Sequence, residues 1–255
     1  MSIMSDNWIR AQCEKPTHVV KKSRGGIEYA SYPFTTFQKQ LFDSQKLYSE
    51  LNITNIKIAN SVATYTMDEI KPITEEQLRN RKPMIYPFVN SNIRVAESGK
   101  KIVSYGVSCY GYDVRLANKF KVFTNVNAGV IDPLSNNDSC YVDMEGDYCI
   151  IPPNSYMLGH TIETFCIPDD ILVVCLGKST YARLAAIVNV TPIEPGFEGQ
   201  VVIEIANSTN LPLKVYANQG IAQFLFFEGN ERCNISYKEK GGKYQGQTGI
   251  TTARL

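Results

Sequence analysis

From about Met84 onward, the sequence alternates between short apolar segments and short clusters of turn-forming residues. The clusters contain Gly, Pro, Asn or Asp, as in EGD, PDD, EPGFEG, NSTN and ANQG. Many short strands at nearly even spacing are typical of an antiparallel barrel, sandwich or jelly roll, so the sequence predicts a mainly β protein. The strand-like segments are residues 119–126, 139–144, 148–165, 170–176, 186–192, 199–207, 211–217 and 220–228.

Two stretches depart from this alternation. Residues 179–186 (STYARLAA) have a Ser/Thr start followed by good helix formers, which predicts a short helix. Residues 12–83 are more polar, and the apolar spacing within residues 35–52 and the start TEEQLRNR at residues 74–81 predict helices there. We expect one domain over residues 1–255, with an accessory segment inserted at about residues 12–83.

The totals exclude several classes of protein. A hydrophobic share of 44% suits a packed chain, and a formal net charge of +1 gives no general attraction for nucleic acid or anionic membranes. We therefore expect neither as a partner. The start MSIMSDNWIRAQCEK lacks the apolar core of a secretion signal. The seven scattered cysteines form no C-x-x-C pair, which indicates reduced thiols in a cytoplasmic protein.

The turn at Gly177 allows two interpretations. A strand runs into Gly177 and Lys178, and a helix with Arg183 follows. Glycine permits a close turn, the helix start offers free N–H groups, and the two cations add charge, which together suit phosphates. The alternative is an ordinary helix start capped by Ser179 or Thr180. The turn is not a P-loop, because the long glycine loop before the lysine is absent.

Glu204 is an isolated acid in the apolar strand QVVIEIAN. Strand alternation places Val202 and Glu204 on one face and Ile203 on the other. If both faces are covered, burial raises the pKa of the carboxyl unless a cation or donor compensates. Such a group is costly, so a functional acid is one interpretation. An exposed sheet face, or a buried salt bridge with an arginine, is the other.

Other polar positions are less decisive. Pro195 and Gly196 fit the two central positions of a tight turn, and Glu194 before them suits either a sugar hydroxyl or solvent. Gln223 lies in an apolar strand, where its amide needs partners from the backbone or a ligand. The end, KEKGGKYQGQTGITTARL, has the composition of a flexible tail, although such a tail can also fold over a ligand as a lid.

Some chemistry has no support in the sequence. There are only two histidines, His18 and His160, and the zinc deaminase signature H-x-E followed by P-C-x-x-C is absent. No G-x-S-x-G or G-x-G-x-x-G motif occurs. We therefore expect that the protein itself binds no metal and no organic cofactor for its chemistry.

Several stretches, in the right order, resemble the dCTP deaminases of the deoxyuridine triphosphatase-like superfamily. They cover everything except about residues 12–83. The resemblance implies a distorted, jelly-roll-like β barrel that assembles as a homotrimer with active sites between subunits. The stretches are MSIMSDNWIR, SYGVSCYGYDVRLANKFKVFTN, CIIPPNSYMLGHT, residues 177–228 and SYKEKGGKYQGQTG.

The resemblance also implies a reaction: zinc-independent hydrolysis of dCTP to dUTP and ammonia, which supplies thymidylate synthesis. Glu204 matches the carboxylate that activates the attacking water, while Ser179 and Arg183 match residues that orient this water and stabilise charge. Mg²⁺ is expected to arrive with the triphosphate, and dTTP is expected as an inhibitor. The implied substrate-binding residues are Lys178, Ser179, Thr180, Tyr181, Ala182, Arg183, Glu194, Val202, Ile203, Glu204, Gln223, Tyr237, Lys243 and Gln247.

Two departures from the family pattern stand out. The inserted segment is not part of it, and Phe197 stands where an indole is common. A bifunctional deaminase that also cleaves the triphosphate, a deoxyuridine triphosphatase and a non-catalytic nucleotide-binding homologue remain alternatives. The tail lacks the glycine-rich, aromatic-containing phosphate motif expected of a pure triphosphatase.

Overall fold

The computed structural model describes residues 2–13, 20–24, 27–31, 55–59, 62–66, 82–126, 129–135, 137–189 and 191–254. The chain divides into two compact units. One comprises residues 1–13 and 83–255, and the other comprises residues 14–82. The single-domain prediction and the role of the inserted segment stay predictions.

The described part of residues 14–82 consists of two antiparallel hairpins. They are β2 (Val20–Arg24) with β3 (Ile27–Ser31), and β4 (Asn55–Ala59) with β5 (Val62–Thr66). No strand was predicted from the sequence in this segment. The helices predicted within residues 35–52 and 74–81 lie outside the described residues.

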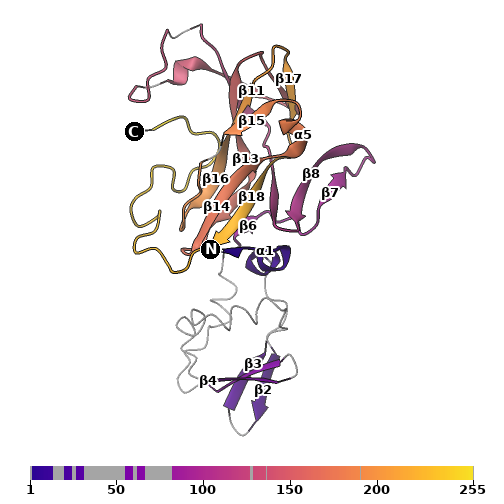
Figure 1. The fold of residues 1–255 in the computed structure, drawn as a ribbon, viewed down its shortest axis with the longest axis vertical. Helices are drawn as coiled ribbons and strands as arrows, with labels where there is room; N and C mark the ends of the chain where they lie inside the picture. The colour runs from indigo at the N-terminus through magenta and orange to yellow at the C-terminus, as the bar shows by residue number, and fades with distance from the viewer. Residues whose placement is uncertain are drawn as a thin grey trace. The chain divides into compact units, whose positions relative to one another are not determined.

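The larger unit contains two six-stranded antiparallel sheets, of which the first is built around β18 (Figure 1). The first sheet has the order β1 (Ser2–Ile3), β18 (Gly220–Glu228), β9 (Gly111–Arg115), β8 (Lys101–Ser108) and β7 (Ile93–Val95), with β14 (Ile171–Gly177) also paired to β18.

The second sheet is built around the long strands β13 and β16. Its order is β11 (Tyr141–Glu145), β10 (Lys119–Phe123), β13 (Tyr156–Cys166), β16 (Glu198–Asn207) and β15 (Ala186–Asn189), with β6 (Ile85–Tyr86) also paired to β13. A separate antiparallel pair joins β12 (Tyr148–Ile151) to β17 (Leu213–Tyr216).

The mainly β prediction is confirmed, since every strand-like segment named from the sequence contains a strand. The segment 148–165 is two strands rather than one, because its Pro152–Pro153 pair cannot continue a ladder. In the larger unit, the described strands form two six-stranded sheets and one separate pair rather than one closed ring. An isolated bridge between Leu116 and Thr161 connects the first sheet's side to β13, and another joins Val173 of β14 to Ile193 between β15 and β16.

The core lies between the two sheets, and several of its largest fully buried side chains are aromatic. The rings of Phe224 on β18 and Phe165 on β13 have centroids 5.0 Å apart, and both side chains are fully buried. Helix α1 (Asp6–Cys13) adds Trp8, whose ring lies 6.1 Å from that of Phe226. Among the described helices, none has the length and apolar character to span a bilayer.

The pairing of β13 with β16 contains an irregularity between His160 and Thr164. Glu163 is fully buried there, and the guanidinium of Arg115 donates to its carboxylate over 2.7 Å. The hydroxyl of Thr161 donates to the Glu163 carbonyl and accepts the N–H of Val201. Burial raises the pKa of Glu163, and the charge and hydrogen bonds of Arg115 oppose that shift.

The two ends of the larger unit that flank residues 14–82 are joined by a backbone hydrogen bond. The Met84 N–H donates to the Gln12 carbonyl over 3.1 Å. Gln12 belongs to α1 and Met84 immediately precedes β6, so the chain leaves and re-enters this unit at one place.

We predict that Phe224→Ala lowers the free energy of unfolding by about 3 to 5 kcal/mol, because it opens a cavity between the two sheets. Leu211→Ala is the matched control, since Leu211 is 69% exposed, and it should change stability by less than about 0.5 kcal/mol. Equilibrium unfolding in urea measures both. Similar losses in the two variants would show that the core does not lie at the Phe165–Phe224 contact.

Candidate active site

Glu204 lies near the middle of the second sheet, where β16 alternates between buried and half-buried residues. Ile203 and Ile205 are buried, whereas Val202 and Glu204 share the half-buried face, as strand periodicity predicts. Its cross-strand neighbours are Leu158 on β13 and Asn189 on β15. Glu204 is therefore held between two strands.

Burial raises the pKa of the Glu204 carboxyl, and a backbone hydrogen bond partly offsets this. Within the described chain Glu204 makes no ion pair, so the interpretation as a buried salt bridge with an arginine is wrong. Burial also raises the pKa of the Cys175 thiol to about 12, and the Glu204 charge adds to this shift. A partly buried carboxyl without a cation is suited to exchanging protons.

An aromatic cluster flanks Glu204 on the second sheet. The hydroxyls of Tyr141 and Tyr156 lie 2.9 Å apart, and the ring of Phe123 stacks on that of Tyr156 at 4.9 Å. Burial raises the pKa of Tyr141, and the charge of Glu204 contributes to this shift. Tyr156 is paired with Ala206, two residues beyond Glu204.

The helix expected at residues 179–186 is a single turn, α5 (Ser179–Ala182). It ends early because Ala185 adopts a positive φ of 56° and β15 begins at Ala186. The interpretation with Ser179 or Thr180 as cap is wrong, because extended Lys178 precedes the helix and no side chain caps it. A one-turn helix also has little macrodipole to offer a phosphate.

The side chains of this turn differ in exposure. Ser179, Thr180, Ala182 and Arg183 are exposed, and the Arg183 guanidinium donates to the Ser179 carbonyl over 3.1 Å. Tyr181 is buried. Its hydroxyl accepts the Tyr216 N–H over 3.2 Å, which anchors the turn to β17.

Strand β15 lies between this turn and Glu204. A methyl group placed on Gly177 would be 3.6 Å from the Val188 side chain, so the turn packs directly on β15. The residue after Val188, Asn189, is paired with Glu204. Gly177 therefore packs on β15, and Glu204 is paired with the same strand. In the described chain, no ion pair joins Arg183 to Glu204.

Lys178 and Gln223 meet at a buried acid that the sequence analysis missed. The Lys178 ammonium pairs with Asp113, and the two side chains are only 12% and 6% exposed. Asp113 is opposite Gln223 in the β9–β18 register, and Gln223 donates to the Ser108 hydroxyl over 2.8 Å. The available signal was an acid between apolar Tyr112 and Val114, the same pattern that marked Glu204.

The Pro195–Gly196 turn is confirmed. Gly196 has φ +80°, and the Phe197 N–H donates to the Glu194 carbonyl over 3.2 Å, as in a type II turn. The Glu194 carboxylate pairs with Lys240 of the C-terminal segment. The ring of Tyr237 packs on that of Phe197 at 5.9 Å.

The C-terminal segment, residues 229–254, lies against β16 of the same chain. Figure 1 shows it as the yellow coil beside β16. The N–H of Gln200 donates to the Gln247 carbonyl, and the Gln247 amide donates back to the Gln200 carbonyl. The Lys243 ammonium donates to the Arg254 carbonyl over 3.4 Å. The expectation of a flexible tail therefore does not hold for the described residues 229–254.

The segment and β15 leave a gap along one side of β16. β15 pairs with residues 204–207 and the segment bonds to residues 198–200, so no strand of the described chain lies beside residues 201–203 on that side. The N–H and C=O of Gln200 point to this side, and strand alternation directs those of Val202 the same way. The backbone next to Glu204 is therefore open to a ligand.

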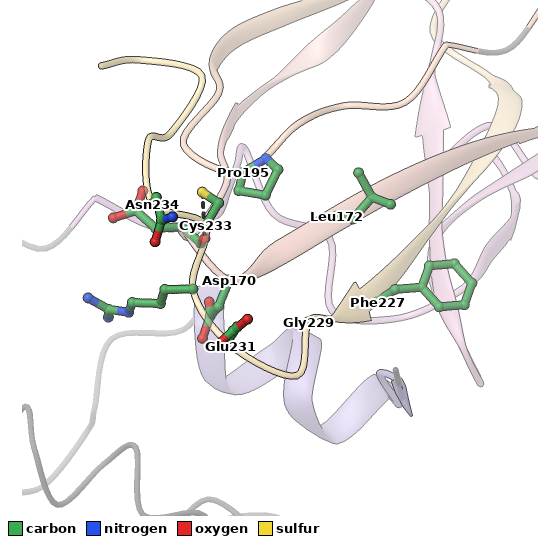
Figure 2. A pocket seen from close by; sticks show the side chains of 10 residues that line it. Asp170, Leu172, Pro195, Phe227, Gly229, Glu231, Cys233 and Asn234 are labelled. Atoms are coloured by element: carbon green, nitrogen blue, oxygen red, sulfur yellow. Dashed lines mark hydrogen bonds between the residues drawn. The ribbon is translucent and has the colours of Figure 1, made fainter. Parts of the chain in front are cut away.

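A pocket of about 330 Å³ lies elsewhere, between the start of β14 and the end of β18 (Figure 2). It is lined by Leu172, Phe227 and Cys233 among others, and it contains none of the side chains predicted for the site. Leu172 is five residues before Gly177, roughly 17 Å along an extended strand. The pocket is therefore not part of the predicted site.

Comparison with known proteins supports the resemblance seen in the sequence. The family model described as dCTP deaminase-like matches residues 72–229. The chain belongs to the dCTP deaminase-like family. It is 58% identical over 168 residues to a dCTP deaminase of Burkholderia mallei (strain SAVP1), with coverage of 66% of this chain and 89% of that protein.

A second relative within the dCTP deaminase-like family agrees. The dCTP deaminase of Acinetobacter baumannii (strain AYE) is 55% identical over 175 residues, covering 69% of this chain and 93% of that protein. The crystal structure of 2'-deoxycytidine 5'-triphosphate deaminase from Agrobacterium tumefaciens aligns with a TM-score of 0.40 at 18% identity, over 48% of this chain and 40% of that one. The family match ends at residue 229, so Tyr237, Lys243 and Gln247 lie beyond it.

We predict that Asp113→Ala lowers the free energy of unfolding by about 3 kcal/mol, because it leaves the buried Lys178 ammonium without its partner. Asp143→Ala breaks a comparable pair with Lys121, but Asp143 is 80% exposed, so the loss should stay below about 1 kcal/mol. Urea unfolding at neutral pH compares the two. Equal losses would mean that Lys178 is solvated without Asp113.

We predict that Glu204→Gln unfolds at a higher urea concentration than the original protein at pH 8. A carboxyl whose pKa is raised by folding favours the folded state at low pH and loses that contribution as pH rises through its folded pKa. The neutral amide escapes this loss, so the difference should shrink towards pH 4. Glu145→Gln, on strand β11, is the control. A midpoint at pH 8 that is unchanged or lower in Glu204→Gln would contradict the burial of this acid.

Proposed function

We propose that the protein is a dCTP deaminase, which hydrolyses dCTP to dUTP and ammonia without a protein-bound zinc ion. The observation that carries this proposal is the half-buried Glu204, which has no ion pair within the described residues and lies one strand away from the Gly177 turn. Chains named dCTP deaminase are 55–58% identical to this one over 168–175 residues, and the family match at residues 72–229 contains both features. Its product would feed pyrimidine deoxyribonucleotide synthesis.

In the proposed reaction, Glu204 is the general base and acid. Its carboxylate accepts a proton from water as the water oxygen bonds to C4 of cytosine, and it passes this proton to N3 of the ring. Glu204 then takes the proton of the new C4 hydroxyl and gives it to the amino group, the C4–N bond breaks, and ammonia leaves while the C4 carbonyl forms. The raised pKa of Glu204 supports this role, because the acid must hold the proton between the two steps. Ser179 and Arg183 would orient the water and stabilise developing charge.

Substrate binding would use both sheets and the C-terminal segment. The open backbone of Val202 suits the donor and acceptor edge of the pyrimidine, whereas the N–H and C=O of Ile203 point towards β13, where Ile203 is paired with Gly159. Glu194 would bind the sugar, while the backbone of Thr180, Tyr181 and Ala182 would line the nucleotide. The triphosphate, taken as its Mg²⁺ complex, would be held by Lys178, Gln223, Tyr237, Lys243 and Gln247.

Two charges in this set are already paired in the single chain. Lys178 is bound to Asp113, and Glu194 is bound to Lys240. A bound triphosphate must therefore either displace Asp113 from Lys178 or bind Lys178 while Asp113 stays in place. In the same way, a sugar hydroxyl must either displace Lys240 from Glu194 or bind beside it. Because Lys178 is buried and its pair is well packed, we propose that Lys178 binds phosphate while keeping Asp113 beside it.

We further propose a homotrimer with active sites between subunits. Support comes from Ser179 and Arg183, which are exposed in the single chain, and from Glu204, which is only half-buried there. Exposed apolar side chains near this face, including Ile187 at 55% and Leu184 at 54%, suit a subunit contact. Inhibition by dTTP stays a prediction of the same resemblance, and a cytoplasmic location stays a prediction from the scattered cysteines.

One assay distinguishes the candidate functions. The protein is incubated with dCTP and Mg²⁺, and the nucleotides are separated. Formation of dUTP indicates the deaminase, formation of dUMP indicates a bifunctional enzyme that also cleaves dUTP, and unchanged dCTP supports a non-catalytic binding protein. The same assay with dUTP as substrate tests the triphosphatase alternative.

We predict that Glu204→Gln lowers kcat by about 100-fold or more, because it removes the general base, while dCTP still binds. Glu145→Gln, which removes a carboxylate from strand β11, should keep its full rate. Turnover by steady-state ammonia release and binding by calorimetry measure the two effects. A Glu204→Gln variant that turns over at the original rate would show that another group activates the water.

A further inference from the structure

The side-chain amide, the backbone N–H and the backbone carbonyl of Gln200 all form hydrogen bonds, and the proposed reaction uses none of them. It lies on β16, four residues before Glu204 and on the same half-buried face. Its side-chain N–H₂ donates to the carbonyls of Thr161 over 3.1 Å and Ile162 over 3.4 Å. Its side-chain oxygen accepts the N–H of Gly249 over 2.7 Å. One amide therefore joins β13 to the C-terminal segment.

The backbone of Gln200 binds the same segment. Its N–H donates to the Gln247 carbonyl over 2.9 Å, and its carbonyl accepts the Gln247 amide over 2.7 Å. Two residues earlier, the carbonyl of Glu198 accepts the Gly246 N–H over 2.8 Å. Residues 245–249 thus run along the start of β16.

Gly199 lets the segment approach this closely. Its φ of +143° is one that other residues rarely adopt, and an added Cβ would lie 2.8 Å from the Gln247 carbonyl oxygen. Gly199, a residue of β16, is therefore one reason why the C-terminal segment can lie so close to this strand.

The irregular pairing of β13 explains why a glutamine suits this position. The register shifts between His160 and Thr164, so the ladder with β16 is interrupted where the Thr161 and Ile162 carbonyls lie. These carbonyls need a donor, and the Gly249 N–H needs an acceptor. The side-chain amide of a glutamine supplies both from one group, whereas a carboxylate lacks the donor and an ammonium lacks the acceptor.

We propose that Gln200 is a positioning residue that holds residues 245–249 on β16 of its own chain before any nucleotide binds. It would thereby fix the position of Gln247 on β16, four residues along the strand from Glu204. The part of this proposal that concerns catalysis rests on the proposed function. The part that concerns the position of the segment does not.

The first test needs no substrate. Amide hydrogen exchange of the original protein should show protection at Gly246 and Gly249. In Gln200→Met, which keeps the side-chain length but removes its hydrogen bonds, exchange at Gly249 should accelerate about tenfold. The matched control is Gln219→Met, since Gln219 also binds a backbone N–H through its side chain, that of Val103, away from the segment. It should leave Gly249 protected.

The second test uses the activity. If the protein deaminates dCTP, Gln200→Met should raise KM for dCTP about tenfold with kcat changed by less than about threefold. A purely structural loss would instead lower the thermal midpoint and the amount of active enzyme without changing KM. Gly246 and Gly249 amides that exchange at free-peptide rates in the original protein would overturn the proposal, as would an unchanged Gly249 rate in Gln200→Met. A protein that does not deaminate dCTP would refute the proposed function, while the exchange result would still decide the role of Gln200.

Discussion

The pairing of β13 with β16 is the interaction on which the rest of this molecule depends. It is the longest strand pair of the second sheet, and it joins residues 156–166 to residues 198–206. One face of the pair contributes Phe165 and Ile203 to the core. The other presents Glu204, and the start of β16 receives the C-terminal segment. A change of register by one residue would exchange these faces, so the core and the site are specified by the same ladder.

Two buried carboxyl groups lie on this pair in contrasting surroundings. Glu163, on β13, accepts hydrogen bonds from the guanidinium and the backbone N–H of Arg115. Glu204, on β16, has no cation in the described chain. Burial raises the pKa of both, but only Glu163 has charged compensation against it. Different surroundings for similar acids are how proteins separate structural from reactive groups.

The sequence was informative wherever the controlling forces are local. Alternation in QVVIEIAN correctly placed Glu204 on the face opposite Ile203, and Pro195–Gly196 correctly predicted a tight turn. The extent of the helix at Ser179 was overestimated, because the positive φ of Ala185 is imposed by the start of β15. Asp113 and Gln200 were missed for a related reason. Their partners, Lys178 and Gly249, are distant in sequence and become neighbours only through sheet register.

The same distinction applies to the proposed site. The proposed roles of Glu204, Ser179 and Arg183 come from the family resemblance, while the geometry of one chain shows an acid paired with β15 and a turn packed on that strand. Exposure of the turn and half-burial of the acid are properties of the single chain. A second chain packed over them would remove further water from Glu204 and strengthen the electrostatic interactions of the site.

The hydrogen bond between Gln12 and Met84 has an evolutionary consequence. Because the chain leaves and re-enters the larger unit at one point, the polypeptide between these residues is equivalent to a closed loop. The length of such a loop can change at little energetic cost. Doubling such a loop adds only about 0.6 kcal/mol of closure entropy. A gene could therefore gain or lose coding sequence at this junction while the ancestral sheets stay intact, which makes the junction a natural place for new modules.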